Sequence, residues 1–194
     1  MGMTQVTVTF LQQLSSSEVI PSAKPLPSQA RIELAQGITP EFSRFLYQCV
    51  GSELNWADRL DSTRAQWNEV LQRPGSETWV LYLDGSPKGY FELVTTHGDP
   101  GTEVEIFYFG LFPEATGRGL GGALLTEALS RAWDLASRWP ALPPVTRVWL
   151  HTCSLDGPAA LPNYQARGLK IYRTEAEESQ VRDASVGLWP QPTG

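Results

Sequence analysis

The sequence predicts a mixed α/β (α+β) fold, with a sheet of about six to eight strands flanked by about four helices. The strongest indication is a strand, a glycine-rich loop and a long helix that follow one another between residues 103 and 138. A second indication is a hairpin pattern, in which two strands flank the turn residues 84–87. A third is a pair of helix-start signals near residues 39 and 61, before the hairpin.

Length and composition fit one globular domain over residues 1–194. Of the 194 residues, 41% are hydrophobic and 19% are charged, and a chain of this length can bury a sizeable core. The net charge of −6 disfavours nucleic acid as a partner, because nucleic acids are bound by basic surfaces. The same charge favours a cationic small molecule as ligand.

Neither the cysteines nor the hydrophobic segments indicate a metal centre, a secreted protein or a membrane protein. Cys49 and Cys153 form neither a metal-binding spacing nor a disulfide framework. The first twenty residues lack the basic start and apolar core of a signal peptide, and no apolar run approaches membrane-spanning length. We expect a cytoplasmic protein with no metal and with no membrane or nucleic-acid partner.

Before residue 77 the pattern is strand, loop, strand and two helices. Residues 5–10 and 31–35 are predicted strands, and the Ser- and Pro-rich residues 15–28 are the expected loop between them. Helices are predicted over residues 39–51, which open on a Thr-Pro pair, and over residues 61–74, which open on an Asp-Ser pair.

After residue 77 strands predominate. The polar residues 175–184 are predicted to be a loop or hairpin tip. Strands are expected at 79–83, 88–94, 103–112, 146–153, 169–173 and 185–189, and helices at 120–138 and 156–166, the last kinked or delayed by Pro162.

The strand over residues 103–112 leads into the glycine-rich loop. Pro113 ends it, because proline cannot donate a ladder hydrogen bond. Strict alternation places one set of side chains on one face (Glu103, Glu105, Phe107, Phe109 and Leu111) and the other set on the opposite face (Val104, Ile106, Tyr108 and Phe112).

The loop carries four glycines within six residues, Gly117, Gly119, Gly121 and Gly122. A helix start offers unpaired N–H groups and the positive end of the macrodipole, so glycines there suit a phosphate. A Walker loop is excluded, because no Gly-Lys-Ser/Thr follows. A Rossmann fingerprint is matched literally, but four residues separate it from the strand and no acid lies about twenty residues later. A turn whose glycines serve only close packing is the remaining alternative.

The stretch resembles the acetyl-CoA signature of the GNAT acyltransferases, in which a strand is followed, often through V-x-P, by Q/R-x-x-G-x-G/A and a long helix. The matching residues are Leu111-Phe112-Pro113 and Thr116-Gly117-Arg118-Gly119-Leu120-Gly121. Thr116 replaces the usual Gln or Arg, so a diphosphate would depend more on backbone N–H groups and on Arg118. The resemblance implies that acetyl-CoA is the co-substrate and that these loop residues bind it (Thr116, Gly117, Arg118, Gly119, Gly121 and Gly122).

A second point of resemblance is the GNAT pattern A-x-x-x-Y-x-x-x-G-F. Ala160, Tyr164 and Gly168 match it, with Leu169 for Phe and with Gly157 where an Asn is common. Together the two motifs cover residues 77–173. They imply a GNAT-like mixed, mostly antiparallel sheet in a single domain over residues 1–194, with residues 1–30 as an N-terminal strand and loop extension. Homodimers are common in this family, so a homodimer is possible.

Amide formation from a thioester requires a base, because an amine with a pKa of about 10.4 is mostly protonated at neutral pH. Counted without gaps from the glycine motif, Glu105 is similar in place to the general-base glutamate of the histone-acetyltransferase branch. The alternatives left open are water and three other carboxylates (Glu92, Glu103 and Asp156).

Tyr164 is the candidate general acid. A phenol with a pKa of about 10 is protonated at neutral pH and can give its proton to the leaving thiolate. In the resembling family two core strands splay apart to admit the pantetheine arm. The backbone groups of Phe109 and Leu111 are then expected to hold that arm and to polarise the thioester oxygen.

Trp56 and Asp58 are candidate substrate contacts, because in GNAT proteins the region between the first two helices commonly forms one wall of the acceptor site. A packed Trp and a solvated Asp are the alternative. Cys153 is a poor candidate nucleophile, because His151, two residues away on a strand, would lie about 6–7 Å from it.

The sequence therefore predicts an acetyl-CoA-dependent N-acetyltransferase, which moves an acetyl group to a primary amine of a small molecule or protein by direct attack. The alternative is a non-catalytic acyl-CoA-binding or sensory module, which the departures at Thr116 and Gly157 leave open.

Overall fold

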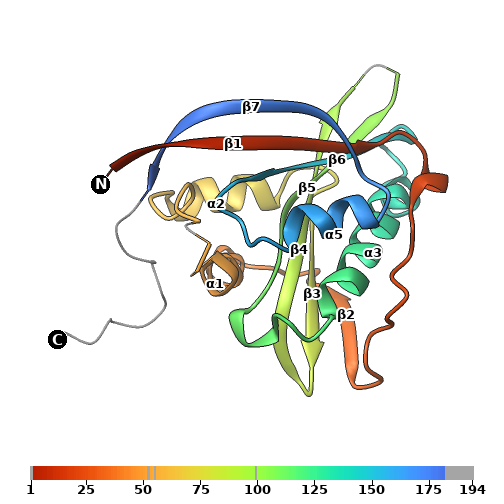
Figure 1. Cartoon of the computed structure of the whole chain (residues 1–194). Coiled ribbons are helices and arrows are strands. Elements are labelled where there is room, and N and C mark those ends of the chain that lie inside the picture. The colour runs from red at the N-terminus through yellow and green to blue at the C-terminus, as the bar shows by residue number, and fades with distance from the viewer. Residues whose placement is uncertain (1, 52, 55, 99, 182–194) are drawn as a thin grey trace.

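The computed structural model describes residues 2–51, 53–54, 56–98 and 100–181. In these residues seven strands form one sheet in the order β2-β3-β4-β5-β6-β1-β7 (Figure 1). Every neighbouring pair is antiparallel except β5 and β6, which are parallel. The predicted mixed, mostly antiparallel sheet is confirmed. The strands are β1 (Gly2–Gln13), β2 (Ala30–Leu34), β3 (Glu77–Leu83), β4 (Ser86–His97), β5 (Thr102–Leu111), β6 (Val145–Cys153) and β7 (Lys170–Val181).

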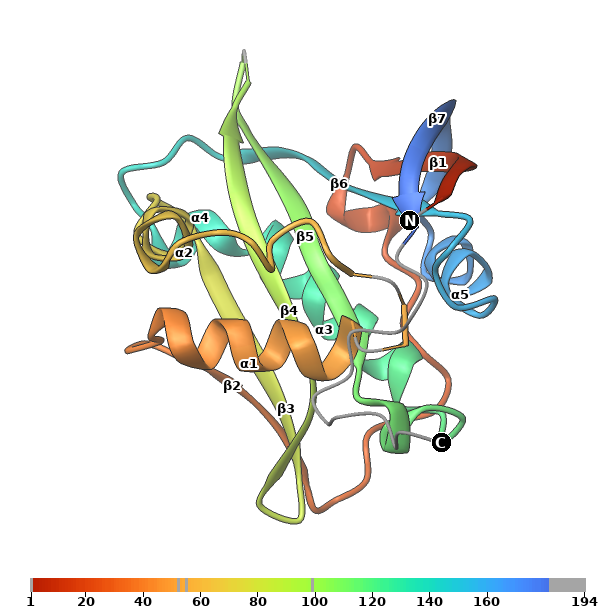
Figure 2. The ribbon, with the colours of Figure 1, turned by 90° about the vertical axis from the view of Figure 1, so that its left-hand side faces the viewer.

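Helices cover both faces of the sheet. In Figure 2, α1 (Pro40–Gly51) and α2 (Arg64–Leu71) lie in front of the strands, and α3 (Leu120–Trp133) lies behind them. The remaining α-helices are short: α4 (Leu135–Arg138) continues α3, and α5 (Ala160–Ala166) packs beside α3. Two 3-10 turns complete the described elements, η1 (Ser16–Glu18) and η2 (Pro113–Ala115). No helix in these residues is long and apolar enough to cross a membrane.

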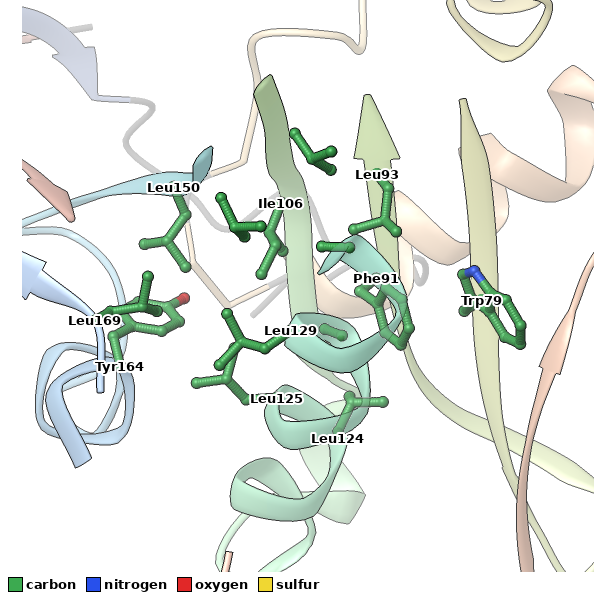
Figure 3. Packing of buried hydrophobic residues seen from close by; sticks show 14 of the residues in the cluster. Trp79, Phe91, Leu93, Ile106, Leu124, Leu125, Leu129, Leu150, Tyr164 and Leu169 are labelled. Carbon is green, nitrogen blue, oxygen red and sulfur yellow. The ribbon is translucent and has the colours of Figure 1, made fainter. Parts of the chain in front are cut away.

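Each face of the sheet has its own hydrophobic core. The core between the sheet and α3 is shown in Figure 3, and it includes Phe91, Ile106, Leu125 and Tyr164. The core under α1 and α2 is rich in aromatic rings, notably those of Tyr47, Trp67, Tyr90 and Tyr108. The sheet is therefore the shared wall between two separately packed layers.

The N-terminal strand is an inner strand of the sheet. Residues 8–13 of β1 pair with β6, and residues 2–12 pair with β7. Gln13, at the end of β1, is fully buried. It accepts a hydrogen bond from the Trp133 indole and donates one to the Arg167 carbonyl, both at 3.0 Å. The first strand thus connects α3 to the end of α5.

Several element boundaries differ from the sequence prediction. The long helix ends at Trp133 and resumes as α4, instead of running to residue 138. The second helix begins after Thr63, because Thr63 and Gln66 form a capping box in place of the predicted Asp-Ser cap. The helix predicted from residue 156 begins at Ala160, which places Pro162 in its first turn, where a missing N–H is tolerated.

The loop predicted over residues 175–184 was wrong where the structure describes it. Residues 170–181 form β7, which pairs with β1 along nearly its whole length. Polar side chains are compatible with this strand, because most of its residues are exposed to solvent and the backbone bonds to β1 do not depend on side-chain type. The strand predicted at residues 185–189 lies outside the described residues.

Candidate active site

The two parallel strands separate halfway along β5. Their pairing runs from Thr102 opposite Val145 to Glu105 opposite Trp149. Beyond this point β5 continues to Leu111, whereas β6 pairs on its other side with β1. Within the described residues, the backbone of β5 from Ile106 onward therefore has no strand partner on the β6 side. An extended ligand that carries amide groups could pair with this edge.

A β-bulge at Phe107 changes the face of the sheet on which the following side chains of β5 lie. Ile106 lies opposite Leu93 and Tyr108 lies opposite Glu92, so Phe107 has no partner residue on β4. Past the bulge, Phe109 joins the α3 core and Tyr108 joins the α1–α2 core. The alternation predicted from sequence therefore holds through Phe107, which lies on the α1–α2 side, and is wrong from Tyr108 onward, because one extra residue exchanges the two faces.

The glycine-rich loop forms the start of α3. Gly117 and Gly119 have φ of +70° and +77°, a conformation that residues with a side chain rarely adopt. Gly119 is the N-cap of α3, and no side chain makes a capping hydrogen bond there. Thr116 directs its hydroxyl to the Pro113 carbonyl, at 2.7 Å, within its own turn. The free N–H groups of this helix start are the principal anion-binding feature of the loop.

Two basic side chains that the sequence did not single out flank this helix start. Lys24, from the β1–β2 connection, donates to the Arg118 carbonyl at 2.8 Å. A Cβ added at Gly122 would lie 2.7 Å from Arg167 Nη1, which places the guanidinium directly over the first turn of α3. Together with the exposed Arg118, these groups surround the loop with positive charge. The helix start therefore fits a polyphosphate such as that of CoA.

Tyr164 lies on α5, across the gap from β5. Its ring makes an edge contact with Phe109, with centroids 6.0 Å apart. Figure 3 shows its hydroxyl on the side of the ring that faces β5. Burial raises the pKa of this phenol, so it stays protonated at physiological pH. The structure thus brings the predicted acid next to one of the predicted pantetheine contacts.

Glu105 lies on the opposite face of the sheet from Tyr164, and its partner is a histidine. Glu105 Oε1 and His151 Nδ1 are 3.2 Å apart. The pKa of His151 is raised mainly by this hydrogen bond; burial acts in the opposite direction, and the charges of Glu105, Asp156 and Asp58 add to the rise. The two residues are 46 positions apart in sequence, and only the parallel pairing of β5 with β6 places them together.

The three alternative carboxylates have structural partners. Glu92 is fully buried beside Arg59, at 3.3 Å, and burial raises its pKa. Glu103 is paired with Arg147 at 3.0 Å. Asp156 accepts a hydrogen bond from the Cys153 N–H at 3.0 Å and so closes the turn after β6. Glu105 differs from these three carboxylates because its partner, His151, can itself accept a proton.

Cys153 is unsuited to nucleophilic attack. Burial and the nearby charge of Asp156 raise the pKa of its thiol, which disfavours the thiolate.

Asp58 and Trp56 lie together beside β5, on the same face as Glu105. The Asp58 carboxylate accepts a hydrogen bond from Tyr47 and one from Tyr108, each at 2.5 Å. The Trp56 ring packs against both tyrosines, at 5.4 and 5.1 Å between centroids. Asp58 itself remains exposed to solvent. The result is a fixed negative charge with aromatic walls, an arrangement that attracts organic cations.

Part of this site could not be recognised in the sequence. Tyr47 and Tyr108 are ordinary core residues by their spacing, and their convergence on Asp58 depends on the packing of α1 against β5. Lys24 and Arg167 come from a loop and a helix end, with no motif around them. His151 was considered only as a partner for Cys153. Its actual partner, Glu105, follows from the strand order.

Comparison with known proteins identifies the family. The model of the acetyltransferase (GNAT) family matches residues 44–169. A search of curated proteins finds no match to the sequence. Among solved structures, a GCN5-related N-acetyltransferase from Kribbella flavida has a TM-score of 0.58 at 17% identity, over 91% of this chain and 59% of that one. A tandem GNAT protein from the clavulanic acid biosynthesis pathway gives 0.56 at 18% identity, over 94% and 56%. An aminoglycoside N-acetyltransferase in complex with CoA gives 0.52 at 19% identity, over 77% and 94%.

These identities support the fold and not a shared substrate. The chain spans only about half to three-fifths of the length of several of the similar structures. The family match extends over about two-thirds of the chain, from α1 to the residue before β7, and includes the glycine-rich loop and Tyr164. On this match, together with the mixed seven-stranded sheet, the chain belongs to the GNAT acetyltransferase family.

Proposed function

We propose that the protein transfers an acetyl group from acetyl-CoA to a primary amine by direct attack. The observation that carries this proposal is the separation of β5 from β6, with the glycine-rich start of α3 at one end of the free β5 edge. Groups suited to proton transfer lie on the two sides of this gap, Tyr164 on the α3 face and Glu105 on the other.

Acetyl-CoA fits the donor side in three respects. The N-terminus of α3, with Arg118, Lys24 and Arg167 around it, would hold the phosphates. On the β6 side, where no described strand pairs with β5 beyond Glu105, the backbone of Phe109 and Leu111 would bond the amides of the pantetheine arm. A side chain at Gly122 would meet Arg167, so the absence of a Cβ keeps this approach open. Bound acetyl-CoA would supply an activated acyl group.

The protein's own residues would supply the proton transfers. On the acceptor side, the hydrogen-bonded pair of Glu105 and His151 would take up the proton that the incoming ammonium must lose before it can attack. Tyr164 would give its proton to the departing thiolate, because its phenol lies buried beside Phe109 and stays protonated. No metal is required for this chemistry, since the thioester is already activated.

The acceptor is proposed to be a small cationic amine. Asp58 accepts hydrogen bonds from two tyrosine hydroxyls, and the Trp56 ring packs against both of these tyrosines. An ammonium group can therefore be bound by the carboxylate charge and by the ring faces together. Asp58 would guide the amine toward Glu105, which lies on the same face of the sheet.

Thiol release from acetyl-CoA, measured over a panel of polyamines, amino acids, aminoglycosides and peptides, tests the transfer. A calorimetric titration with CoA and with NAD tests the donor separately. Tight CoA binding without thiol release for any amine would favour the non-catalytic acyl-CoA-binding module. NAD binding without CoA binding would contradict both this module and the acetyltransferase.

Replacing Asp58 with Asn should weaken the acceptor side alone. Loss of one fixed charge should raise KM for the best cationic acceptor about tenfold or more, while the Kd for CoA stays unchanged. Asp84→Asn is the matched control, since it removes the same charge at the exposed β3–β4 turn, where φ is +53° and Asn is tolerated. An equal change in both variants would contradict a binding role for Asp58.

A further inference from the structure

We propose that His151 takes the proton from the acceptor amine and that Glu105 is the positioning residue which orients the imidazole. This inference rests on the proposed function and deepens it. It starts from the 3.2 Å contact between His151 Nδ1 and Glu105 Oε1, on the face of the sheet that also carries Asp58.

The partner of Nδ1 decides which ring nitrogen carries the proton. A carboxylate can only accept a hydrogen bond, so Nδ1 is the donor. A neutral imidazole has one N–H, and its other nitrogen, Nε2, is then a proton acceptor. One proton passes from the acceptor ammonium to Nε2, and the nitrogen lone pair of the amine is released for attack on the thioester. The ring becomes an imidazolium, whose charge the Glu105 carboxylate offsets.

The side chains of Glu105 and His151 differ in their exposure to solvent. The side chain of Glu105 is 9% exposed and already bonded through Oε1, whereas that of His151 is 44% exposed. An amine that arrives from solvent therefore meets the imidazole before the carboxylate. The same exposure lets the imidazolium return its proton to water after transfer.

The position of His151 along β6 fits this role. Trp149 is the last β6 residue paired with β5, and His151 follows two residues later, on the same face of the strand. His151 thus lies where the two strands begin to separate. The stretch of β5 that is proposed to bind acetyl-CoA starts at this same point.

The charges that face His151 all favour its protonated form. They are Glu105 from β5, Asp156 from the turn after β6 and Asp58 from the α1–α2 connection. The β1 residue beside it, Phe10, is uncharged. The pKa of His151 therefore lies above the ordinary value of 6.5, with the Glu105 hydrogen bond as the main cause. The neutral base form prevails only above that raised pKa, so turnover should rise with pH through it.

Nuclear magnetic resonance tests the arrangement without turnover. The chain has two histidines, His97 and His151, so a His97→Gln variant assigns the signals of the ¹⁵N-labelled rings. We expect the Nδ1–H tautomer for neutral His151 and a pKa above 6.5, which falls toward 6.5 in Glu105→Gln. An Nε2–H tautomer, or a pKa that Glu105→Gln does not change, would overturn the proposal.

Steady-state kinetics tests whether His151 acts as the general base. His151→Gln should lower kcat about 10²–10⁴-fold and abolish the rise of kcat with pH that follows the histidine. Glu105→Gln should lower kcat by a smaller factor, because the Gln oxygen still accepts a hydrogen bond from Nδ1–H. The rise of kcat with pH should move to lower pH in this variant. The opposite outcome, in which His151→Gln stays active and Glu105→Gln loses most of its turnover, would show that Glu105 is itself the base. Absence of thiol release in the unaltered protein would count against the transfer reaction, whereas the tautomer and pKa would still decide the His151–Glu105 arrangement.

Discussion

At the scale of single residues, Tyr164 is the most direct test of chemistry on the α3 face. Tyr164→Phe keeps nearly all of the buried ring and removes only the hydroxyl. We expect kcat to fall about 10²–10⁴-fold, with little change in the Kd for CoA, because a proton donor acts mainly in the transition state. Steady-state rates beside a binding titration measure this. Tyr172→Phe on the exposed β7 strand is the control, and near-normal turnover in Tyr164→Phe would refute the acid role.

The sequence allows single residues to be proposed for the site where a local motif marks them. The spacing of Tyr164 from Gly168 and the place of Glu105 before the glycine loop are both readable along the chain. The partners of such residues were not readable. His151 meets Glu105, and Tyr47 meets Asp58, only because distant segments share one face of the sheet. Contacts of this kind are set by strand order and helix packing, which a single sequence does not contain.

At the scale of elements, the loop before α3 can be tested by a pair of substitutions that differ only in charge. Asn and Asp have similar size and both tolerate the positive φ of Gly119. Gly119→Asp places a negative charge at the helix start and should weaken CoA binding at least tenfold more than Gly119→Asn. Calorimetry with CoA measures both. Equal affinities for the two variants would show that the helix start does not hold the phosphates.

The connection between α1 and α2 is held to the sheet by a buried ion pair. Arg59 contacts Glu92 of β4 at 3.3 Å and stacks over the Trp67 ring, 3.8 Å from its centroid. Arg59→Met would leave the buried Glu92 carboxylate without its counter-charge. We expect a loss of about 3–5 kcal/mol in the free energy of unfolding, measured by urea denaturation at neutral pH.

The same variant should show a characteristic pH dependence. The pKa of Glu92 is raised by burial even beside Arg59, so the folded state binds the proton more tightly than the unfolded state. Stability from such a group is present at low pH and is lost as pH rises above the unfolded value of about 4.3. Arg59→Met should therefore be destabilised less at pH 5 than at pH 8. The double variant Arg59→Met/Glu92→Gln should lose this dependence, and a loss that is constant over pH would point to packing alone.

Elements were predictable where side-chain periodicity or caps define them, and their ends were less so. The amphipathic pattern of α3 is clear, yet the break at Asp134 has no marker as strong as Pro or Gly. β7 was missed beyond residue 173 because an exposed strand paired with β1 needs no alternation of apolar residues. The bulge at Phe107 was also invisible, since it depends on the register with β4.

At the scale of the whole molecule, β1 is expected to be indispensable to the sheet. It separates β6 from β7, contributes the fully buried Leu11, and ends in Gln13, which bonds both α3 and the end of α5. A variant that lacks residues 2–13 should lose its cooperative thermal transition, because β7 then has no strand partner in the described chain. Removal of residues 2–5 alone should be tolerated, since the β6 pairs begin at Val8. A cooperative transition after the longer deletion would contradict this view.

The strand order also has a consequence for how the chain is made. β1 leaves the ribosome before the other six strands, but its two neighbours, β6 and β7, are synthesised more than 130 residues later. The unit from β2 to β5 can pair locally during synthesis, whereas closure of the sheet around β1 must wait for the last third of the chain. The half of the molecule that carries His151 and Tyr164 therefore assembles last. A nascent or truncated chain would expose β1 as an unpaired strand, open to capture by chaperones or to aggregation.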